Sequence, residues 1–248
     1  MALPPLTPYA TLRWDVVRGH LPTHRSTVLE VGCGQGAVAV RLAQRHDYTG
    51  VELDGPAVEL ARRRMADAGL DGRFVHGGVE ELDGEDGGFD LVCAFEVLEH
   101  IEDDLAAATH WVRRLRPGGR LLLSVPAWQS RYGAMDEAVG HFRRYDPSAL
   151  KEVLELAGAE GVGMRQYGMP LGYALEAVRN QIAGRSQGMR EEGTVADRTA
   201  RSGRLFQPRT VLAGAGIRAG TYPFRLVQRA FPSRGTGLVA WAYRPTSV

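Results

Sequence analysis

The chain has 248 residues, 44% of them hydrophobic, which is enough to bury the core of one α/β domain of ordinary size. Its formal net charge of +1 gives no basis for a dedicated nucleic-acid surface, so we expect no nucleic-acid partner. Lys151 is the single lysine, and the arginines are scattered among a similar number of acidic residues, which excludes a concentrated phosphate-binding segment.

Residues 27–126 alternate between strand-like and helix-like segments, a pattern that predicts a parallel sheet covered by helices. An N-terminal helix is expected before them, at 7–19. In chain order the expected strands are 27–32, 48–53, 73–78, 89–95 and 120–126. The expected helices are 37–45, 56–69 and 102–115, the last of them ended by Pro117-Gly118-Gly119.

The pattern is looser after residue 126. A helix at 146–160, a strand at 161–167 and a final strand at 235–245 are still expected. Residues 169–234 form a long insert with helical flanks, and their polar centre, 184–204, is expected to be a mobile loop or a lid. We therefore expect one domain, divided into an N-terminal helical segment (1–26), a core (27–168), the insert (169–234) and the final strand (235–248).

The sequence VLEVGCGQGAVAV, which starts at Val28, places glycines at the end of the first expected strand. Gly32, Gly34 and Ala37 satisfy the G-x-G-x-x-G/A pattern of a dinucleotide site. Gly32, Gly34 and Gly36 also satisfy the E/D-x-G-x-G-x-G pattern of enzymes that use S-adenosylmethionine (SAM). Both ligands need bare backbone at this turn, so the glycines alone do not decide between them.

Two carboxylates bear on the choice. Glu30 lies on the strand just before the turn, where an anion suits the methionine ammonium of SAM and is unhelpful beside a pyrophosphate. Glu52 follows Gly32 by 20 positions and ends the second strand, the usual place for an acid that binds ribose hydroxyls in either kind of site. Asp54 is the alternative ribose acid, but it lies past the strand end.

The chain resembles the class I SAM-dependent methyltransferases, especially the small-molecule branch that includes the ubiquinone-type O-methyltransferases. Five elements carry the resemblance, in order and at the usual spacing, over about residues 27–126: VLEVGCGQG, GVELD, GGVEEL, FDLVCAFEVLEHIED and LRPGGRLLLSVP. Residues 140–160 also resemble the next segment of the chain in one subgroup. The resemblance implies a Rossmann-like, doubly wound, seven-stranded sheet whose last strand is antiparallel, with the insert as a partly helical cap.

The resemblance also implies roles for individual residues. The methionine and ribose would be bound by Glu30, Gly32, Cys33, Gly34, Gly36, Glu52 and Leu53, the adenine by Gly78, Val79 and Glu80, and the methionine and acceptor side by Phe95 and Glu96. Gly78 departs from the family, which commonly has an aspartate there. Glu80, backbone atoms or water would then hold the adenine amino group.

Two histidines are candidates for proton transfer from an acceptor. His100 follows the fourth strand, and Glu96 would orient it if the intervening turn is helical; the alternative is that His100 only closes the cofactor pocket. His141 follows the fifth strand and an aromatic loop. The neighbouring candidates for acceptor binding are Trp128, Tyr132, Arg143, Arg144 and Tyr145, although Arg144 and Tyr145 alternatively fix the loop to the core.

We therefore expect SAM-dependent methylation of a small molecule, with oxygen as the favoured acceptor atom and S-adenosylhomocysteine (SAH) as the product. The alternatives are N- or C-methylation of a secondary metabolite or lipid-linked compound, a nicotinamide-dependent oxidoreductase, and a SAM-fold binding protein without activity. No metal-type spacing of histidine or cysteine is present, so no metal is expected. We expect a cytoplasmic protein with two reduced cysteines and with neither a signal peptide nor a membrane span. The resemblance also leaves open a homodimer formed through the cap.

Overall fold

A computed structural model describes residues 3–82, 87–186 and 210–246 of the chain. Its sheet has seven strands: β1 (Thr27–Val31), β2 (Asp47–Glu52), β3 (Arg73–His76), β4 (Phe89–Phe95), β5 (Leu115–Pro126), β6 (Glu160–Gly168) and β7 (Gly235–Tyr243). The helices are α1 (Pro8–Val17), α2 (Ala39–Ala43), α3 (Gly55–Asp67), α4 (Asp104–Arg114), α5 (Ala134–Val139), α6 (Pro147–Leu156), α7 (Leu171–Ser186), α9 (Val211–Gly220) and α10 (Tyr222–Ala230). Three short 3-10 turns lie between them: η1 (Val79–Glu81), η2 (Leu98–His100) and η3 (Gln129–Arg131).

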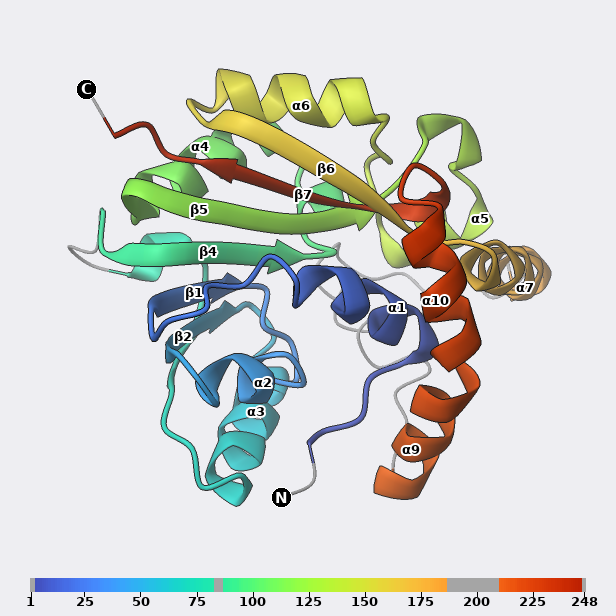
Figure 1. Cartoon of the computed structure of the whole chain (residues 1–248), viewed down its shortest axis with the longest axis horizontal. Coiled ribbons are helices and arrows are strands. Elements are labelled where there is room, and N and C mark those ends of the chain that lie inside the picture. Colours follow the sequence, from blue (N-terminus) through green and yellow to red (C-terminus); the bar gives the residue numbers. More distant parts are fainter. Residues whose placement is uncertain (1–2, 83–86, 187–209, 247–248) are drawn as a thin grey trace.

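The strand order is β3-β2-β1-β4-β5-β7-β6. Strands β1 to β5 are parallel to one another, and β7 is inserted antiparallel between β5 and β6. The doubly wound sheet and its antiparallel last strand, both implied by the resemblance, are confirmed (Figure 1).

Helices cover both faces of the sheet, and each face has its own core. Helices α4 and α6 pack on one face through side chains such as Trp111 and Leu154. Helices α1, α2 and α3 pack on the other, through side chains such as Leu12, Val40 and Met65. Because both faces are buried, β4 is apolar along most of its length, as a central parallel strand should be.

The fifth strand begins earlier than the sequence predicts. We expected a strand at 120–126 after a helix stop at Pro117-Gly118-Gly119, but β5 already starts at Leu115 and includes all three residues. Pairing with the C-terminal strand continues there, since the Gly118 N–H donates to the Arg244 carbonyl at 2.9 Å and the Arg244 N–H donates to the Gly119 carbonyl at 2.9 Å. The Pro-Gly-Gly stop signal ends α4, but the backbone then joins the sheet at once.

The insert contributes three helices to the described structure. Helix α7 packs against α5 and the end of the sheet, whereas α9 and α10 pack against α1. Most of the polar centre that we expected to be a loop or lid, residues 187–204, lies outside the described residues. The helical flanks of the insert are confirmed.

Candidate active site

One cavity of about 1040 Å³ lies at the carboxyl edge of the central strands. Its walls come from the ends of β1, β2 and β4, from α1 on one side and from α5 and α7 on the other. This is the point of the sheet where the strand order reverses, between β1 and β4, and doubly wound folds bind ligands there.

The three glycines after β1 have different surroundings, although all three have positive φ angles of 68°, 52° and 77°. A Cβ on Gly32 would lie 2.5 Å from Cγ2 of Val97, and one on Gly36 would lie 2.8 Å from Cβ of Ala61. A Cβ on Gly34 would meet no described atom within 4 Å. Gly32 and Gly36 are therefore required by packing, whereas Gly34 opens on to the cavity.

Gly36 does not line the cavity, in contrast to Gly32, Cys33 and Gly34. Its role in the structure is the close approach of the turn to α3, which a side chain would prevent. Sequence reasoning grouped Gly36 with the ligand-facing glycines because the motif does not distinguish contact with a ligand from contact with a helix.

The two carboxylates selected from the sequence both line the cavity but differ in their environment. Oε2 of Glu52 accepts the Gly34 N–H at 2.8 Å, and Oε1 accepts the Asp54 N–H at 3.0 Å. Glu30 is 3% exposed, and its Oε2 accepts the hydroxyl of Tyr48 at 2.7 Å. Burial raises the pKa of Glu30 to about 8, against the opposing effects of Tyr48 and Arg13.

The candidate adenine residues lie together on the same side of the cavity. Gly78, Val79 and Glu80 all border it at η1, and Leu53 borders it from the end of β2 with 68% of its surface exposed. A Cβ on Gly78 would run into the carboxylate of Glu80. The position of Glu80 is therefore consistent with a glycine here, where the family commonly has an aspartate.

Glu96 has a left-handed backbone, with a φ of 60°, at the carboxyl end of β4. Its Oε1 accepts hydrogen bonds from Ser124 at 2.9 Å and Tyr167 at 3.0 Å, and lies 3.4 Å from the guanidinium of Arg13. Non-glycine residues with this backbone are uncommon and are enriched at functional sites. Both Glu96 and the neighbouring Phe95 border the cavity.

His100 and His141, 41 positions apart in the sequence, meet on the far wall of the cavity. Their ring centroids are 4.6 Å apart in an edge-to-face arrangement. Burial, and secondarily His141, lowers the pKa of His100 to about 4, so at neutral pH this imidazole is uncharged and a weak proton acceptor.

His141 has a carboxylate partner that sequence analysis did not identify. Its Nδ1 lies 2.7 Å from Oδ1 of Asp136, which is 2% exposed. Burial disfavours the charge of Asp136, but hydrogen bonds from His141 and Arg144 outweigh it and lower its pKa to about 2. A carboxylate only accepts, so Nδ1 of His141 carries the hydrogen, and Nε2, which lies 3.9 Å from Oε1 of Glu99, is the nitrogen left to take an acceptor's proton.

Glu99 lies beside the two histidines, with its Oε1 3.9 Å from Nε2 of His141, but is not among the residues that border the cavity. It is fully buried, its pKa is raised by burial and by Glu96, and neither carboxyl oxygen has a hydrogen-bond partner among the described residues. Donor atoms of Glu99, His100 and His141 lie within 4.8 Å of one another, a grouping that no sequence spacing revealed. The expectation of a metal-free site therefore stays a prediction to be tested.

Of the five candidate acceptor-binding residues, only Arg144 is among those that border the cavity within the described structure. Arg144 is 7% exposed, and its guanidinium already pairs with Asp136 at 2.7 Å and with Glu176 at 3.1 Å. Arg143 pairs with Asp104 at 2.9 Å. Both charges are therefore balanced inside the protein, which leaves little to attract an anionic acceptor.

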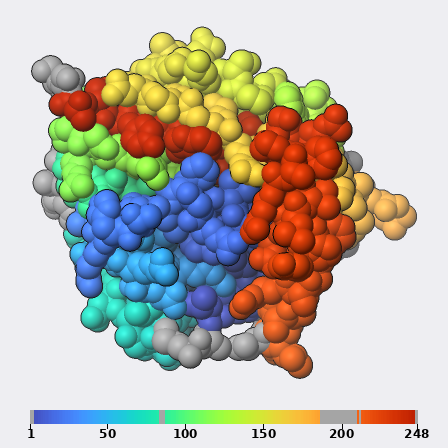
Figure 2. Space-filling model, in the orientation of Figure 1, coloured from blue at the N-terminus to red at the C-terminus, as the bar shows by residue number. Residues whose placement is uncertain are grey.

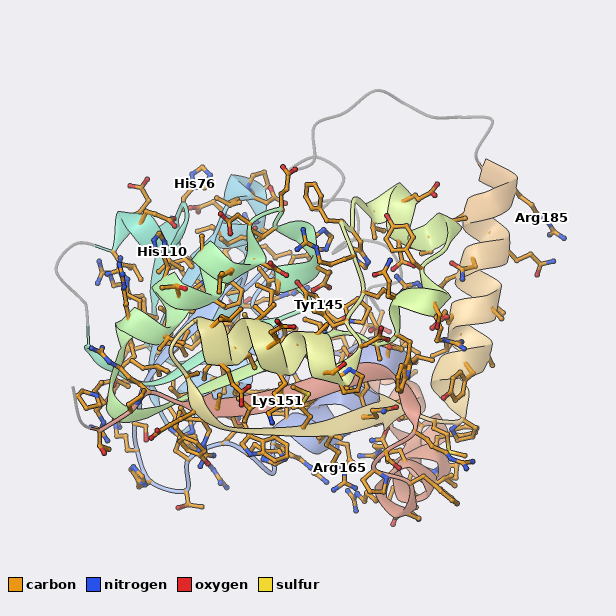
Figure 3. The ribbon with its side chains drawn as sticks, turned by 90° about the horizontal axis from the view of Figure 1, so that it is seen from above. His76, His110, Tyr145, Lys151, Arg165 and Arg185 are labelled. Atoms are coloured by element: carbon orange, nitrogen blue, oxygen red, sulfur yellow. The ribbon has the colours of Figure 1, made fainter. Side chains whose placement is uncertain are left out.

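The polar group of each of the three aromatic candidates is hydrogen-bonded within the protein. The Tyr145 hydroxyl donates to Asp104 at 2.8 Å, the Tyr132 hydroxyl donates to the His141 carbonyl at 2.7 Å, and the Trp128 indole N–H donates to the Gly235 carbonyl at 3.3 Å. Figure 3 shows Tyr145 inside the molecule beside α6, while Arg185 points outward from the end of α7. These contacts support the alternative that Tyr145 and Arg144 fix the loop.

Residues of α1 also line the cavity, although sequence analysis assigned them no site role. Tyr9 and Arg13 face it, and the Tyr9 hydroxyl is 2.9 Å from Oγ1 of Thr236, 227 positions along the chain. Trp14, on the same helix, packs against the core. No local signal in residues 8–17 indicates this contact, because it depends on where β7 enters the sheet.

Comparison with known proteins agrees with this geometry. Residues 28–119 match the family described as "Methyltransferase domain". Over these residues the chain is similar to methyltransferase domains. The match confirms the resemblance recognised from the five sequence elements, and it contains the glycine turn, Glu52 and His100.

The curated relatives match over similar lengths. A 27-O-demethylrifamycin SV methyltransferase of Amycolatopsis mediterranei is 38% identical over 114 residues, which cover 44% of this chain and 42% of the relative. A ubiquinone biosynthesis O-methyltransferase of Xanthomonas oryzae is 34% identical over 122 residues, 48% of this chain and 51% of the relative. The chain thus spans about half the length of these relatives.

Solved structures share the fold over almost the whole chain. The [4+2]-cyclase SpnF aligns with a TM-score of 0.64 and 22% identity over 97% of this chain and 81% of its own. Phosphoethanolamine N-methyltransferase 2 of Haemonchus contortus, in complex with S-adenosyl-L-methionine, aligns with a TM-score of 0.60 and 16% identity over 94% of this chain and 52% of its own. Within the described residues, no helix has the length and apolar character needed to cross a membrane.

Proposed function

We propose that this protein transfers a methyl group from SAM to an oxygen atom of a small molecule, with His141 as the general base. One observation carries the proposal: the glycine turn with Glu52 and the His141–Asp136 pair border the same cavity. A volume of about 1040 Å³ is at the upper end of the range for small-molecule sites, which suits a cofactor and an acceptor together.

The described residues fit the cofactor. The space beside Gly34 accommodates a ligand against bare backbone, and the Glu52 oxygens keep lone pairs for the ribose hydroxyls after accepting their two backbone N–H groups. Glu30 would face the methionine ammonium, whose positive charge favours ionisation of this buried carboxyl group. When bound, SAM supplies the methyl group and a good leaving group, so the protein has to align the acceptor and remove its proton.

His141 is the better base of the two histidines. Asp136 fixes its tautomer and stabilises the imidazolium that forms when Nε2 takes a proton. His100 has a pKa of about 4 and packs edge-to-face against the His141 ring, so we assign it to orienting that ring and excluding water. An amine acceptor needs only to arrive neutral, so a requirement for this base separates O-methylation from N-methylation, whereas C-methylation also has a proton to remove.

Calorimetric titration tests the cofactor assignment. We expect SAH to bind in the micromolar range and NADH not to bind, and Glu52→Ala to weaken SAH binding by at least about tenfold through loss of the ribose contacts. Glu59→Ala, an exposed acidic residue on α3, is the matched control and should leave the affinity unchanged. Absence of SAH binding would reject the proposal, and binding of NADH instead would favour an oxidoreductase.

Turnover is tested separately with radiolabelled SAM and a panel of phenols, alcohols and amines. Transfer of label to hydroxyl acceptors supports the proposal. SAH binding without transfer to any acceptor would instead indicate a binding protein with a methyltransferase fold.

A further inference from the structure

Helices α9 and α10 form one continuous ridge on the surface, which we call the α9–α10 ridge (residues 211–230). Thr221 joins them with helical backbone angles, φ −83° and ψ −9°. One face of the ridge packs on the N-terminal part of the chain through residues that are seven positions apart. Gly214 faces Pro5, Thr221 is 3% exposed, and Gln228 is fully buried. The Gln228 side-chain N–H donates to the Leu12 carbonyl at 3.0 Å, so this face has its partner.

Next to this attached face, the ridge exposes large apolar side chains. Leu212 is 83% exposed, Tyr222 56% and Leu226 48%, and Phe231, just past the helix end, is 44% exposed. Tyr222 and Leu226 are four positions apart and therefore lie on the same side of α10. In Figure 2 the ridge stands at the surface beside α1.

The sequence around these apolar groups contains arginines but no acidic residue. Residues 210–234 contain Arg218, Arg225, Arg229 and Arg234 and not one Asp or Glu. Arg225 lies over the ring of Tyr222, 5.3 Å from its centroid, and Arg218 is exposed one turn before Tyr222. Arg229 differs, since it pairs with Asp15 at 2.9 Å and holds the ridge to α1.

This combination determines the kind of partner. A second copy meeting the same face across a twofold axis would bring four copies of Arg218 and Arg225 into an interface to which residues 210–234 contribute no carboxylate, and such a concentration of like charge is unfavourable. Exposed leucine and aromatic groups interleaved with arginine, on a helix without acids, are typical of helices that lie on anionic lipid. We propose that the α9–α10 ridge docks on an anionic membrane surface, with Tyr222, Leu226 and Phe231 entering the headgroup region and Arg218 and Arg225 pairing with lipid phosphates.

The docking surface is close to the cavity. Helix α1 carries the ridge on one side and contributes Tyr9 and Arg13 to the cavity on the other. On α7, Val178 borders the cavity and is 54% exposed. This geometry favours an acceptor that is dissolved in the membrane. The inference about the acceptor rests on the proposed function, whereas the inference about lipid docking does not.

Vesicle sedimentation with the full chain tests the docking. We expect the protein to sediment with vesicles of phosphatidylcholine and phosphatidylglycerol (3:1) in low salt, and to remain in solution with pure phosphatidylcholine. Arg218→Glu with Arg225→Glu should weaken binding by at least about tenfold, because each arginine near an anionic surface contributes substantially. Leu226→Ser, which changes no charge, should also weaken binding, by about three- to tenfold.

The matched control reverses two exposed charges elsewhere: Arg63→Glu on α3 with Lys151→Glu on α6, the latter labelled in Figure 3. This variant has the same net charge as the ridge variant and should bind vesicles nearly as well as the unaltered protein. Equal loss in both double variants, or no effect of Leu226→Ser, would overturn the proposal by showing nonspecific attraction. Lack of sedimentation, combined with a dimer in ultracentrifugation that Leu226→Ser dissociates, would overturn it in favour of a contact between copies. Neither outcome depends on SAH binding or methyl transfer.

Discussion

Nδ1 of His141 lies 2.7 Å from Oδ1 of Asp136, and the turn at Gly140 brings them together. Gly140 has a φ of 81° and ends α5 in the left-handed conformation, so the chain reverses and the His141 N–H donates to the Asp136 carbonyl at 2.9 Å. Backbone and side chain of His141 are therefore both fixed by one residue of the preceding helix. A base held in this way has its second nitrogen, Nε2, in a defined position.

We expect His141→Ala to lower methyl transfer to a hydroxyl acceptor by about 10²–10⁴-fold while SAH affinity changes little, because proton removal is lost and the cofactor contacts are kept. Turnover and calorimetry on the same preparation measure the two effects. His24→Ala, at an exposed position, is the control. Unchanged turnover in His141→Ala would contradict the role of His141 as general base and favour alignment alone.

Turnover that survives dialysis against EDTA would support a metal-free site. Loss of turnover that a divalent ion restores would refute that expectation.

Most strands and helices could be predicted from the sequence because their signals are local, whereas the seven-stranded sheet with its antiparallel last strand was implied by the family resemblance. Apolar runs such as Phe89–Phe95 and helix boundaries such as Pro56 and Gly69 depend on neighbouring residues alone. The Asp136–His141 pair had a local signal too, since a glycine after a short helix indicates a chain reversal, but the contact needs the αL geometry to be recognised. Tyr9 and Thr236 meet only when β7 inserts between β5 and β6, and nothing near either residue predicts it.

Gly34→Ala and Gly36→Ala should have opposite consequences. Gly34 has open space where a Cβ would stand, so alanine costs only the left-handed strain, about 1–2 kcal/mol, but blocks the cofactor. Gly36 adds overpacking against Ala61, for a total of roughly 2–5 kcal/mol. Urea unfolding and SAH titration of both variants should show lost binding with modest destabilisation for Gly34→Ala and the larger destabilisation for Gly36→Ala. The reverse pattern would mean that Gly36, not Gly34, contacts the ligand.

SAH binding should become tighter as the pH rises from 6 to 8. With a pKa of about 8, roughly one molecule in a hundred has an ionised Glu30 at pH 6, and a bound ammonium favours the ionised form. Affinity should therefore increase by up to about tenfold per pH unit in this window, and Glu30→Gln should remove the slope. Titrations at four pH values measure it, with Glu59→Gln as the control. A flat profile in the unaltered protein would show that Glu30 does not ionise on binding.

His100 should make the fold less stable in mild acid. Its folded-state pKa of about 4 lies below the unfolded value of 6.5, so between these pH values the unfolded chain binds more protons and stability rises with pH. The contribution is fully present above pH 6.5 and is lost as the pH falls towards 4, by up to roughly 3 kcal/mol. Glu30 acts with the opposite sign between pH 4.5 and 8, because its folded-state pKa is raised, so the unaltered protein shows only the difference. Urea unfolding of His100→Gln and of the control His24→Gln from pH 4 to 7 isolates the effect. Between pH 4 and 7 the free energy of unfolding should rise by up to roughly 3 kcal/mol less in His100→Gln than in the unaltered protein and in the control. An equal rise in all three proteins would show that His100 titrates alike in the folded and unfolded chain.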